Sequence, residues 1–420
     1  NRYVAIWADK LNQKHATSHS LEYWRFVLIN WLLTSIQELW MRFLHTQSLI
    51  SKNGKDDFSV EVSPLDPPLR PYGFWDFFHQ QLYSPRFDFW ISSLIVRKLA
   101  PPNWQILEPS DIAAWNEPED DEQFPKPNIL GKQSFLGKIV RSMFGRFAFD
   151  SVPGATFEKV LFSLYLNLLP KKGRGRTYFR FDDDQVLTEF PKEFFEILDQ
   201  FLEATIPIAY DTGFRELEEK AALEKVVPGR LFIGNLMPSD ELKRLVLARA
   251  LEAGERFITV QHGSNPGVTS LVCWSVEFEY PYHAYLTWGW REQDDYPGTF
   301  IPLPAPMLNP FREKHRETNS TLAMVAGGRE IRDIRLYGPR PKQSIKCREQ
   351  KLEFIDRLSA GPRQNLKYFA YVRRQQDLLD EEYLTQHCPD LQITRGGLNQ
   401  EMLKTRLLFM DKPGTSMILA

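Results

Sequence analysis

The sequence predicts an α/β protein with two Rossmann-like domains and a helical N-terminal region. Short apolar segments alternate with segments of helical periodicity on both sides of a proline-rich stretch, which is the pattern of βαβ units in parallel sheets. A chain of 420 residues also exceeds what one ordinary hydrophobic core organises, so we expect more than one domain. Apolar residues at helical spacing over residues 20–45 predict the helical region.

The N-terminal region is expected to begin with a short apolar strand at 3–7 and to continue with the helix over 20–45. We interpret the apolar stripe of that helix as core packing, with a peripheral membrane contact as the alternative. Residues 51–130 are rich in proline and are expected to be irregular, and a further helix is expected at 191–204. The stripe consists of Leu21, Trp24, Val27, Leu28, Trp31, Leu32 and Ser35.

The first predicted βαβ unit lies in residues 231–260. An apolar strand at 231–233 is followed by a helix that begins near Ser239 and carries acidic residues in its first turn. A second strand at 257–260 and a third at 284–287 complete the pattern. This spacing is that of a parallel sheet.

The second predicted domain follows a proline-rich linker at 297–317, where five prolines within 297–310 disfavour regular structure. We therefore expect one domain at 1–296 and a second at 318–420, which ends before its sheet is complete. The second domain is expected to contain strands at 322–325, 366–372, 391–394 and 406–410, and helices at 347–358 and 399–405.

Composition excludes several classes of protein. Lys plus Arg (52) nearly balance Asp plus Glu (54), so a nucleic-acid partner is not expected. The longest apolar run is much shorter than the roughly 20 residues of a spanning helix, which favours a cytoplasmic protein, with a peripheral contact to the inner membrane left open. Three scattered cysteines do not form a zinc or disulfide pattern. The acidic run 182–184 is interpreted as a solvated turn, so no metal is expected.

The sharpest local feature is the segment Gln261-His262-Gly263-Ser264, which directly follows a predicted strand. Ligands of open parallel sheets bind beyond the carboxyl ends of the strands, and a histidine there can transfer protons near neutral pH. A histidine that only caps backbone groups is the alternative. Asp240, at the same predicted edge, and Glu277, on the predicted loop before the third strand, are candidate carboxylate partners of His262.

The predicted second domain carries a possible phosphate site. Gly414, Thr415 and Ser416 follow the strand at 406–410, and small residues at a helix N-terminus leave backbone N–H groups free for phosphate. An ordinary capping turn is the alternative. Arg373 follows the strand at 366–372 and could add a bidentate contact to phosphate. No Walker A loop or dinucleotide fingerprint is present, so no nucleotide cofactor is expected.

Five segments in order resemble a bacterial family of transferases encoded in O-antigen and other surface-polysaccharide loci. That family is similar to two-Rossmann, GT-B-type glycosyltransferases and, more distantly, to transferases that use CMP-activated sugars such as Kdo. The segments are HSLEYWRFVLINWL (19–32), VQHGSNPGV (260–268), YLTWGW (285–290), YVRR (371–374) and RLLFMDKPGTS (406–416).

The resemblance implies roles for the matching residues. His262 would be the acid/base or would bind the leaving phosphate, with Glu277 or Asp240 as its partner. The implied donor-binding residues are Gln261, Gly263, Ser264, Arg373, Asp411, Gly414, Thr415 and Ser416. This chain departs from the family pattern after Gly263, where Ser264-Asn265-Pro266 replace a second glycine and an aromatic residue, and at Ile418-Leu419, where the family has Leu-Glu.

The implied function is a metal-independent glycosyltransferase without a further cofactor. It would move a sugar from a nucleotide-sugar donor, CMP-linked as one option, to a surface polysaccharide or a lipid-linked glycan. The domain at 1–296, with its helical insertions, would be the acceptor side, and 318–420 would bind the nucleotide-sugar. Two alternatives stay open: a CDP-polyol phosphotransferase of the teichoic-acid type, and a non-catalytic carbohydrate assembly protein.

Overall fold

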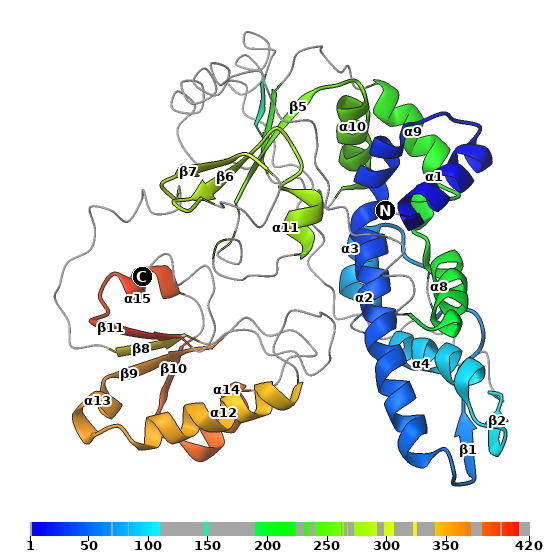
Figure 1. Ribbon diagram of the computed structural model, residues 1–420. Helices are drawn as coiled ribbons and strands as arrows, with labels where there is room; N and C mark the ends of the chain where they lie inside the picture. Colours follow the sequence, from blue (N-terminus) through cyan, green and yellow to red (C-terminus); the bar gives the residue numbers. More distant parts are fainter. Residues whose placement is uncertain are drawn as a thin grey trace. The chain divides into compact units, whose positions relative to one another are not determined.

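The computed structural model divides the chain into two compact units (Figure 1). The first unit comprises Asn1–Asp150 and Thr177–Ile258, and the second comprises Ser151–Arg176 and Thr259–Ala420. These units are defined by how compactly the chain packs and not by what they bind. The predicted division into an acceptor-side domain, a linker and a donor-side domain therefore stays a prediction. The structure describes residues 2–68, 70–82, 84–109, 147–149, 190–223, 231–234, 240–261, 263, 267, 273–291, 298–305, 322–325, 341–370, 380–394 and 397–410.

The first unit is built around one long helix, α2 (Figure 1). This helix begins after the N-cap Ser20, whose hydroxyl accepts a hydrogen bond from the backbone N–H of Tyr23 at 3.2 Å. Every residue of the predicted stripe except Leu21 is buried, so the core-packing interpretation is confirmed. The helices packed around α2 (Leu21–Asn53) are α1 (Arg2–His15), α4 (Pro85–Leu99), α8 (Lys192–Thr205) and α10 (Glu241–Glu252).

The strand predicted at 3–7 is wrong, because these residues lie in α1. Val4, Trp7, Ala8 and Leu11 are all buried, and their spacing is that of one helix face. A window of five apolar residues does not distinguish a strand from a buried helical turn, whereas the pattern extended to Leu11 does. The helix predicted at 191–204 is confirmed as α8.

The irregular structure predicted for 51–130 is wrong over its described part. Strands β1 (Phe58–Glu61) and β2 (Trp104–Leu107) form a parallel pair, and α4 lies between them in sequence. Proline is compatible with α4 because Pro85 lies in its first turn after the N-cap Ser84. Further short elements are α3 (Phe74–Asp76), η1 (Phe77–Gln81), η3 (Ile208–Tyr210) and α9 (Phe214–Leu223).

A five-stranded sheet has the order β3-β4-β5-β6-β7. The predicted strand, helix, strand and strand of residues 231–287 are confirmed as β4, α10, β5 and β6. The N-cap of α10 is Asp240, one residue later than predicted, and Gly254 ends the helix with a φ of +84°. The strands are β3 (Phe147–Phe149), β4 (Leu231–Gly234), β5 (Arg256–Val260), β6 (Ala284–Trp288) and β7 (Phe300–Leu303).

Strand β7 lies inside the segment predicted to resist regular structure, so that prediction is wrong for residues 300–303. It pairs in parallel with β6, and Pro302 is in register with Thr287. Among the described strands β7 is the last in the order, so none of them pairs with its second side. An edge position tolerates a proline that lacks a backbone N–H.

The second unit contains a parallel four-stranded sheet of order β10-β9-β8-β11. Met324 and Tyr368 pack with α12 and α14 on one face, whereas Ala323 and Phe369 pack with Leu398 of α15 on the other (Figure 1). The predicted α/β class with parallel sheets is thereby confirmed. The elements are β8 (Leu322–Val325), α12 (Pro341–Asp356), α13 (Ala360–Gln364), β9 (Leu366–Phe369), α14 (Asp380–His387), β10 (Gln392–Thr394), α15 (Leu398–Met402) and β11 (Leu407–Met410).

Candidate active-site loop at the ends of β5 and β6

Gln261 directly follows β5 and marks the place where two strands of the sheet end together. Its backbone N–H donates to the carbonyl oxygen of Leu286 in β6 at 2.9 Å. The residue is only 2% exposed, so its side-chain amide lies inside the protein. A buried amide needs hydrogen-bond partners, and their identity shows what Gln261 does in the fold.

The side chain of Gln261 joins the turn after β5 to the segment after β6. Its Oε1 accepts a hydrogen bond from the backbone N–H of Trp288 at 2.7 Å and from Nε1 of Trp290 at 2.8 Å. Its Nε2 donates to the carbonyl oxygen of Gly263 at 2.7 Å. These three bonds, which we call the Gln261 clamp, connect Gln261 to Gly263 and to the segment 288–290.

Two glycines let the backbone pass close to the clamp. Gly267 has a φ of +85°, and a Cβ atom at this position would overlap the indole ring of Trp290. Gly289, between the two tryptophans, has a φ of +89°. Both conformations lie in the left-handed region that favours glycine.

An aromatic cluster supports the clamp from β6 and β7. The ring of Trp290 lies 5.4 Å from that of Phe300, and the ring of Tyr280 lies 4.7 Å from that of Tyr285. Burial, with the charge of Glu279 nearby, raises the pKa of Tyr285 well above its usual range. The phenol of Tyr285 is therefore neutral near physiological pH.

Glu277 lies in the helix α11 (Cys273–Phe278) rather than on the predicted loop, so that expectation is wrong. The more buried carboxylate of this segment is Glu279, which is 1% exposed. Its backbone carbonyl accepts a hydrogen bond from the hydroxyl of Thr259 in β5 at 2.7 Å. This bond connects the segment after α11 to β5, the strand that carries Gln261.

Asp240 lies in the first compact unit and caps α10. Its Oδ1 accepts hydrogen bonds from the backbone N–H groups of Leu242 at 2.9 Å and Lys243 at 3.4 Å. A carboxylate at a helix N-terminus is stabilised in its charged form by the helix dipole. A proton-transfer role for Asp240 stays a prediction.

Most of the other predicted site residues lie outside the described residues. Gly263 is described, and its carbonyl is part of the Gln261 clamp. Sequence reasoning did not identify Trp288 and Trp290 as partners of Gln261, although the YLTWGW segment drew attention to them. The residues that lie outside are His262, Ser264, Arg373, Asp411, Gly414, Thr415 and Ser416, and the acidic run 182–184.

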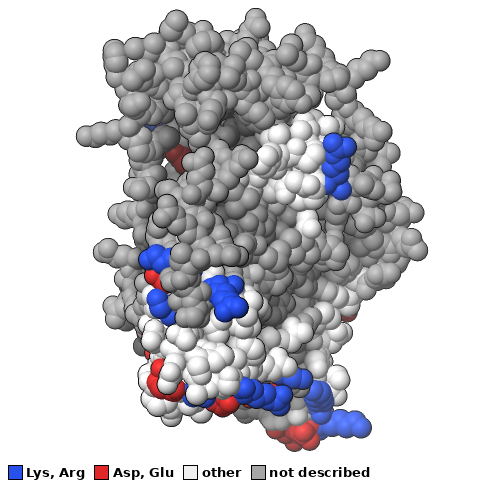
Figure 2. Space-filling view, turned by 90° about the vertical axis from the view of Figure 1, so that its left-hand side faces the viewer, with Lys and Arg blue, Asp and Glu red and all other residues white. Residues whose placement is uncertain are grey.

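Within the described ranges, three further observations limit the chemistry. No group of three or more His, Cys, Asp or Glu side chains is placed to hold a metal ion. No helix among these residues has the length and apolar character to cross a membrane. Basic and acidic side chains lie side by side around α12 and α13 (Figure 2), and Arg363 there pairs with Asp390 at 2.9 Å.

In α/β proteins with parallel sheets, ligands bind beyond the carboxyl ends of the strands. The Gln261 clamp lies at such an end, after β5 and β6. Over residues 1–420 the sequence matches the LIC12162 family of transferases, and the chain belongs to this family. No curated protein and no solved structure matches the chain.

Proposed function

We propose that this transferase is a glycosyltransferase of the two-Rossmann, GT-B type. It moves a sugar from a nucleotide-sugar donor to a surface polysaccharide or a lipid-linked glycan, without a metal ion. The membership in a transferase family and the parallel strand pairs of the four-stranded and five-stranded sheets support this proposal. We further propose that the protein acts in the cytoplasm, where a peripheral contact with the inner membrane gives access to a lipid-linked acceptor.

The observation that carries the proposal is the Gln261 clamp. Three bonds of 2.7–2.8 Å fix Gln261 and bind the carbonyl of Gly263, the two sequence neighbours of His262, and a reacting group must be held rigidly to act efficiently. The clamp commits the side chain of Gln261 to the protein. We therefore assign Gln261 a positioning role in place of a direct donor contact.

The roles that we propose for the remaining residues are those implied by the family resemblance of the sequence. His262 acts as the acid/base or binds the leaving phosphate, with Glu277 or Asp240 as its carboxylate partner. Arg373 and the backbone N–H groups of 414–416, together with Asp411, neutralise the phosphates of the donor. Such fixed donors stabilise developing negative charge in place of a cation.

A ligand screen on the full chain tests the proposal. We expect one UDP-, GDP- or CMP-linked sugar to raise the midpoint of thermal unfolding, since a ligand that binds only the folded state stabilises it. His262→Ala should lower turnover with that sugar by roughly 100-fold or more while the thermal shift persists. His387→Ala, on the exposed end of α14, is the control and should leave turnover unchanged.

Three outcomes would contradict the proposal. A thermal shift with CDP-glycerol or CDP-ribitol alone would favour the polyol phosphotransferase. No shift with any activated donor would favour the assembly protein. Full turnover by His262→Ala would remove this histidine from the reaction.

A further inference from the structure

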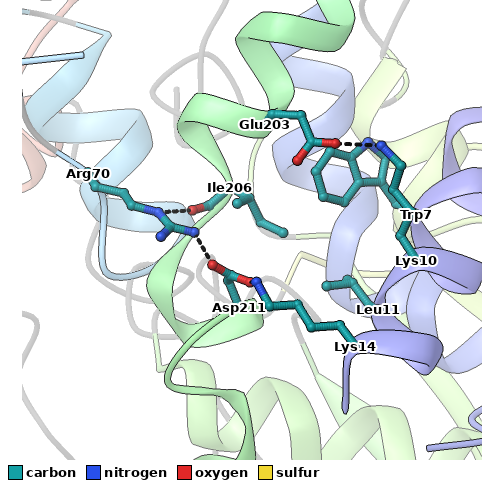
Figure 3. Close-up of a pocket in the computed structure, with 8 residues that line it drawn as sticks. All are labelled: Trp7, Lys10, Leu11, Lys14, Arg70, Glu203, Ile206 and Asp211. Carbon is teal, nitrogen blue, oxygen red and sulfur yellow. Dashed lines mark hydrogen bonds and ion pairs between the residues drawn. The ribbon is translucent and has the colours of Figure 1, made fainter. Parts of the chain in front are cut away.

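A pocket lies in the first unit between α1 and the segment that follows α8 (Figure 3). Its volume is about 370 Å³, which is within the range of roughly 300–1,000 Å³ that is usual for small-molecule sites. The residues that line it are Trp7, Lys10, Leu11, Lys14, Arg70, Glu203, Ile206 and Asp211.

The charged side chains of this pocket carry an excess of positive charge. Among the described residues that line the pocket, Lys10, Lys14 and Arg70 lie beside two carboxylates, those of Glu203 and Asp211 (Figure 3). One cation is therefore left without a balancing charge among the lining residues. A pocket with this balance favours an anionic ligand.

Asp211 holds two of the cations in place. It is 7% exposed, and its carboxylate accepts hydrogen bonds from Lys14 on one oxygen and from Arg70 on the other. Arg70 is fixed a second time, since its Nε donates to the carbonyl oxygen of Ile206 at 3.1 Å. Burial opposes ionisation, but the hydrogen bonds from Lys14 and Arg70 prevail and lower the pKa of Asp211. The carboxylate therefore stays charged near neutral pH and fixes the geometry of the wall.

Lys10 and Lys14 supply the donors for a ligand. They are four residues apart on α1 and therefore lie on the same face of the helix. Within the described part of the chain, each ammonium donates to one carboxylate, so two of its three N–H donors remain for another acceptor. The partner of Lys10 is Glu203, whose side chain is 57% exposed. An ion pair so exposed is weak and gives way to a ligand easily.

The floor of the pocket is apolar and rigid. Trp7, Leu11 and Ile206 are each less than 5% exposed. The indole of Trp7 is held by an edge-to-face contact with Trp31, with 5.3 Å between ring centroids. The ammonium of Lys10 lies 4.9 Å from the centre of the Trp7 ring, so a basic group and an apolar surface meet at one point.

We propose that this pocket binds an anionic sugar. The carboxylate or phosphate of the sugar accepts hydrogen bonds from Lys10 and Lys14, and an apolar face of its ring lies against Trp7, Leu11 and Ile206. The inference that the ligand is an anion depends on the pocket alone. The sugar part rests on the proposed function, in which a glycan is the acceptor.

Calorimetric titration of the full chain with glucose 1-phosphate, glucuronate and glucose tests this site. The first two should bind, more weakly at high salt, and glucose should not. Lys10→Met and Lys14→Met should each weaken binding by about tenfold or more, the effect of removing a charged hydrogen bond. Lys220→Met is the matched control, because Lys220 pairs with the exposed Glu216 on α9 as Lys10 pairs with Glu203. It should leave binding unchanged.

The site is overturned if neither anionic sugar binds, or if both lysine variants bind as the unaltered chain does. If Lys14→Met fails to fold because Asp211 loses a partner, Lys10→Met decides, since Lys10 is about half exposed. Binding of inorganic phosphate as tight as that of glucose 1-phosphate would overturn the sugar part. These titrations contain no nucleotide, so they test the pocket separately from the donor site. If the anionic sugars bind but no nucleotide-sugar does, the result counts against the proposed function and not against the pocket.

Discussion

At the scale of single residues, the Gln261 clamp is the feature with the most direct consequence. The partners of Gln261, Trp288 and Trp290, are 27 and 29 residues further along the chain. Sequence alone predicted that Gln261 follows a strand, but it could not supply this pairing, because periodicity does not report which strand ends meet. The sequence interpretation therefore assigned Gln261 to the donor, and the structure shows that its amide is bound by the protein.

Gln261→Leu removes all three bonds of the clamp and keeps the approximate size of the side chain. It leaves the backbone N–H of Trp288 and the indole N–H of Trp290, which are part-buried, without their acceptor, so we expect the free energy of unfolding to fall by about 1–3 kcal/mol. If His262 acts as proposed, turnover should fall roughly tenfold or more, because its sequence neighbours Gln261 and Gly263 lose the bonds that fix them.

Urea denaturation and steady-state kinetics measure the two effects. Gln105→Leu is the control, because Gln105 is an exposed residue of β2 with one long bond of 3.4 Å to Ser59. It should change stability by less than about 0.5 kcal/mol. Unchanged turnover by Gln261→Leu would contradict the positioning role.

His19 gives a pH-dependent contribution to stability. Its Nδ1 lies 2.9 Å from Glu252 and its Nε2 lies 3.2 Å from Glu218. Burial disfavours the imidazolium, but hydrogen bonds to Glu218 and Glu252 prevail and raise the pKa of His19. Because the folded-state pKa exceeds that of the unfolded chain, the stabilisation is complete below about pH 6.5 and is lost as pH rises through the folded-state value.

His19→Gln should therefore lower the free energy of unfolding more at pH 5.5 than at pH 9. Urea denaturation at the two pH values measures the difference. His387→Gln, on the exposed end of α14, is the control for the replacement of an imidazole by an amide. An equal loss at both pH values would mean that the proton on His19 does not stabilise the fold.

At the scale of elements, helix α2 has a predictable apolar stripe and also buried polar atoms, two of them on Trp31 and Ser35 of that stripe, whose lack of partners periodicity did not reveal. The four polar atoms Asn30 Nδ2, Trp31 Nε1, Thr34 Oγ1 and Ser35 Oγ are buried and have no hydrogen-bond partner in the structure, as far as it describes the chain. Strand β8 was predicted with its observed bounds, because the apolar run is followed closely by Gly327 and Gly328, which favour the end of a strand. Strand β7 was not, because tolerance of Pro302 depends on strand order.

Two matched threonines test how much a buried hydroxyl without a partner costs in stability. Thr34 and Thr205 are both buried in helices, but only Thr205 donates, to the carbonyl oxygen of Phe201 at 2.8 Å. Thr34→Val should leave stability unchanged or raise it by up to about 1 kcal/mol, because it removes a buried hydroxyl without a bond. Thr205→Val should lower stability by about 1 kcal/mol. Thermal and urea denaturation measure both changes, and a clear loss with Thr34→Val would mean that its hydroxyl holds an ordered water or a ligand.

At the scale of the whole molecule, charge limits the choice of partners. The formal net charge is −2, and basic and acidic side chains are mixed on the described part of the face in Figure 2. The sequence predicted this balance directly, because composition alone determines it. The class of parallel α/β protein was predictable for a different reason: the alternation of strand-like and helix-like segments can be read from the order of residues. The bounds of the compact units depend on contacts between distant residues, which no local pattern supplies.

We expect no specific or salt-dependent binding to duplex DNA. A protein of this charge neutralises few phosphates, so its dissociation constant should be weaker than about 10⁻⁴ M at physiological salt. Fluorescence anisotropy with a labelled duplex measures it, with a basic DNA-binding protein as the positive control. Tight binding that weakens with salt would show that a local basic surface overrides the net charge.

The bond from Trp290 to Gln261 also gives the protein a built-in spectroscopic reporter. An indole N–H that donates to a buried amide has a chemical environment different from that of a hydrated indole. Fluorine-labelled tryptophan would report it as one resonance, assigned by its disappearance in Trp290→Phe. Movement of that resonance on addition of a nucleotide-sugar would show that the Gln261 clamp adjusts during binding, whereas a stationary resonance in the presence of a bound ligand would show that the clamp is preformed.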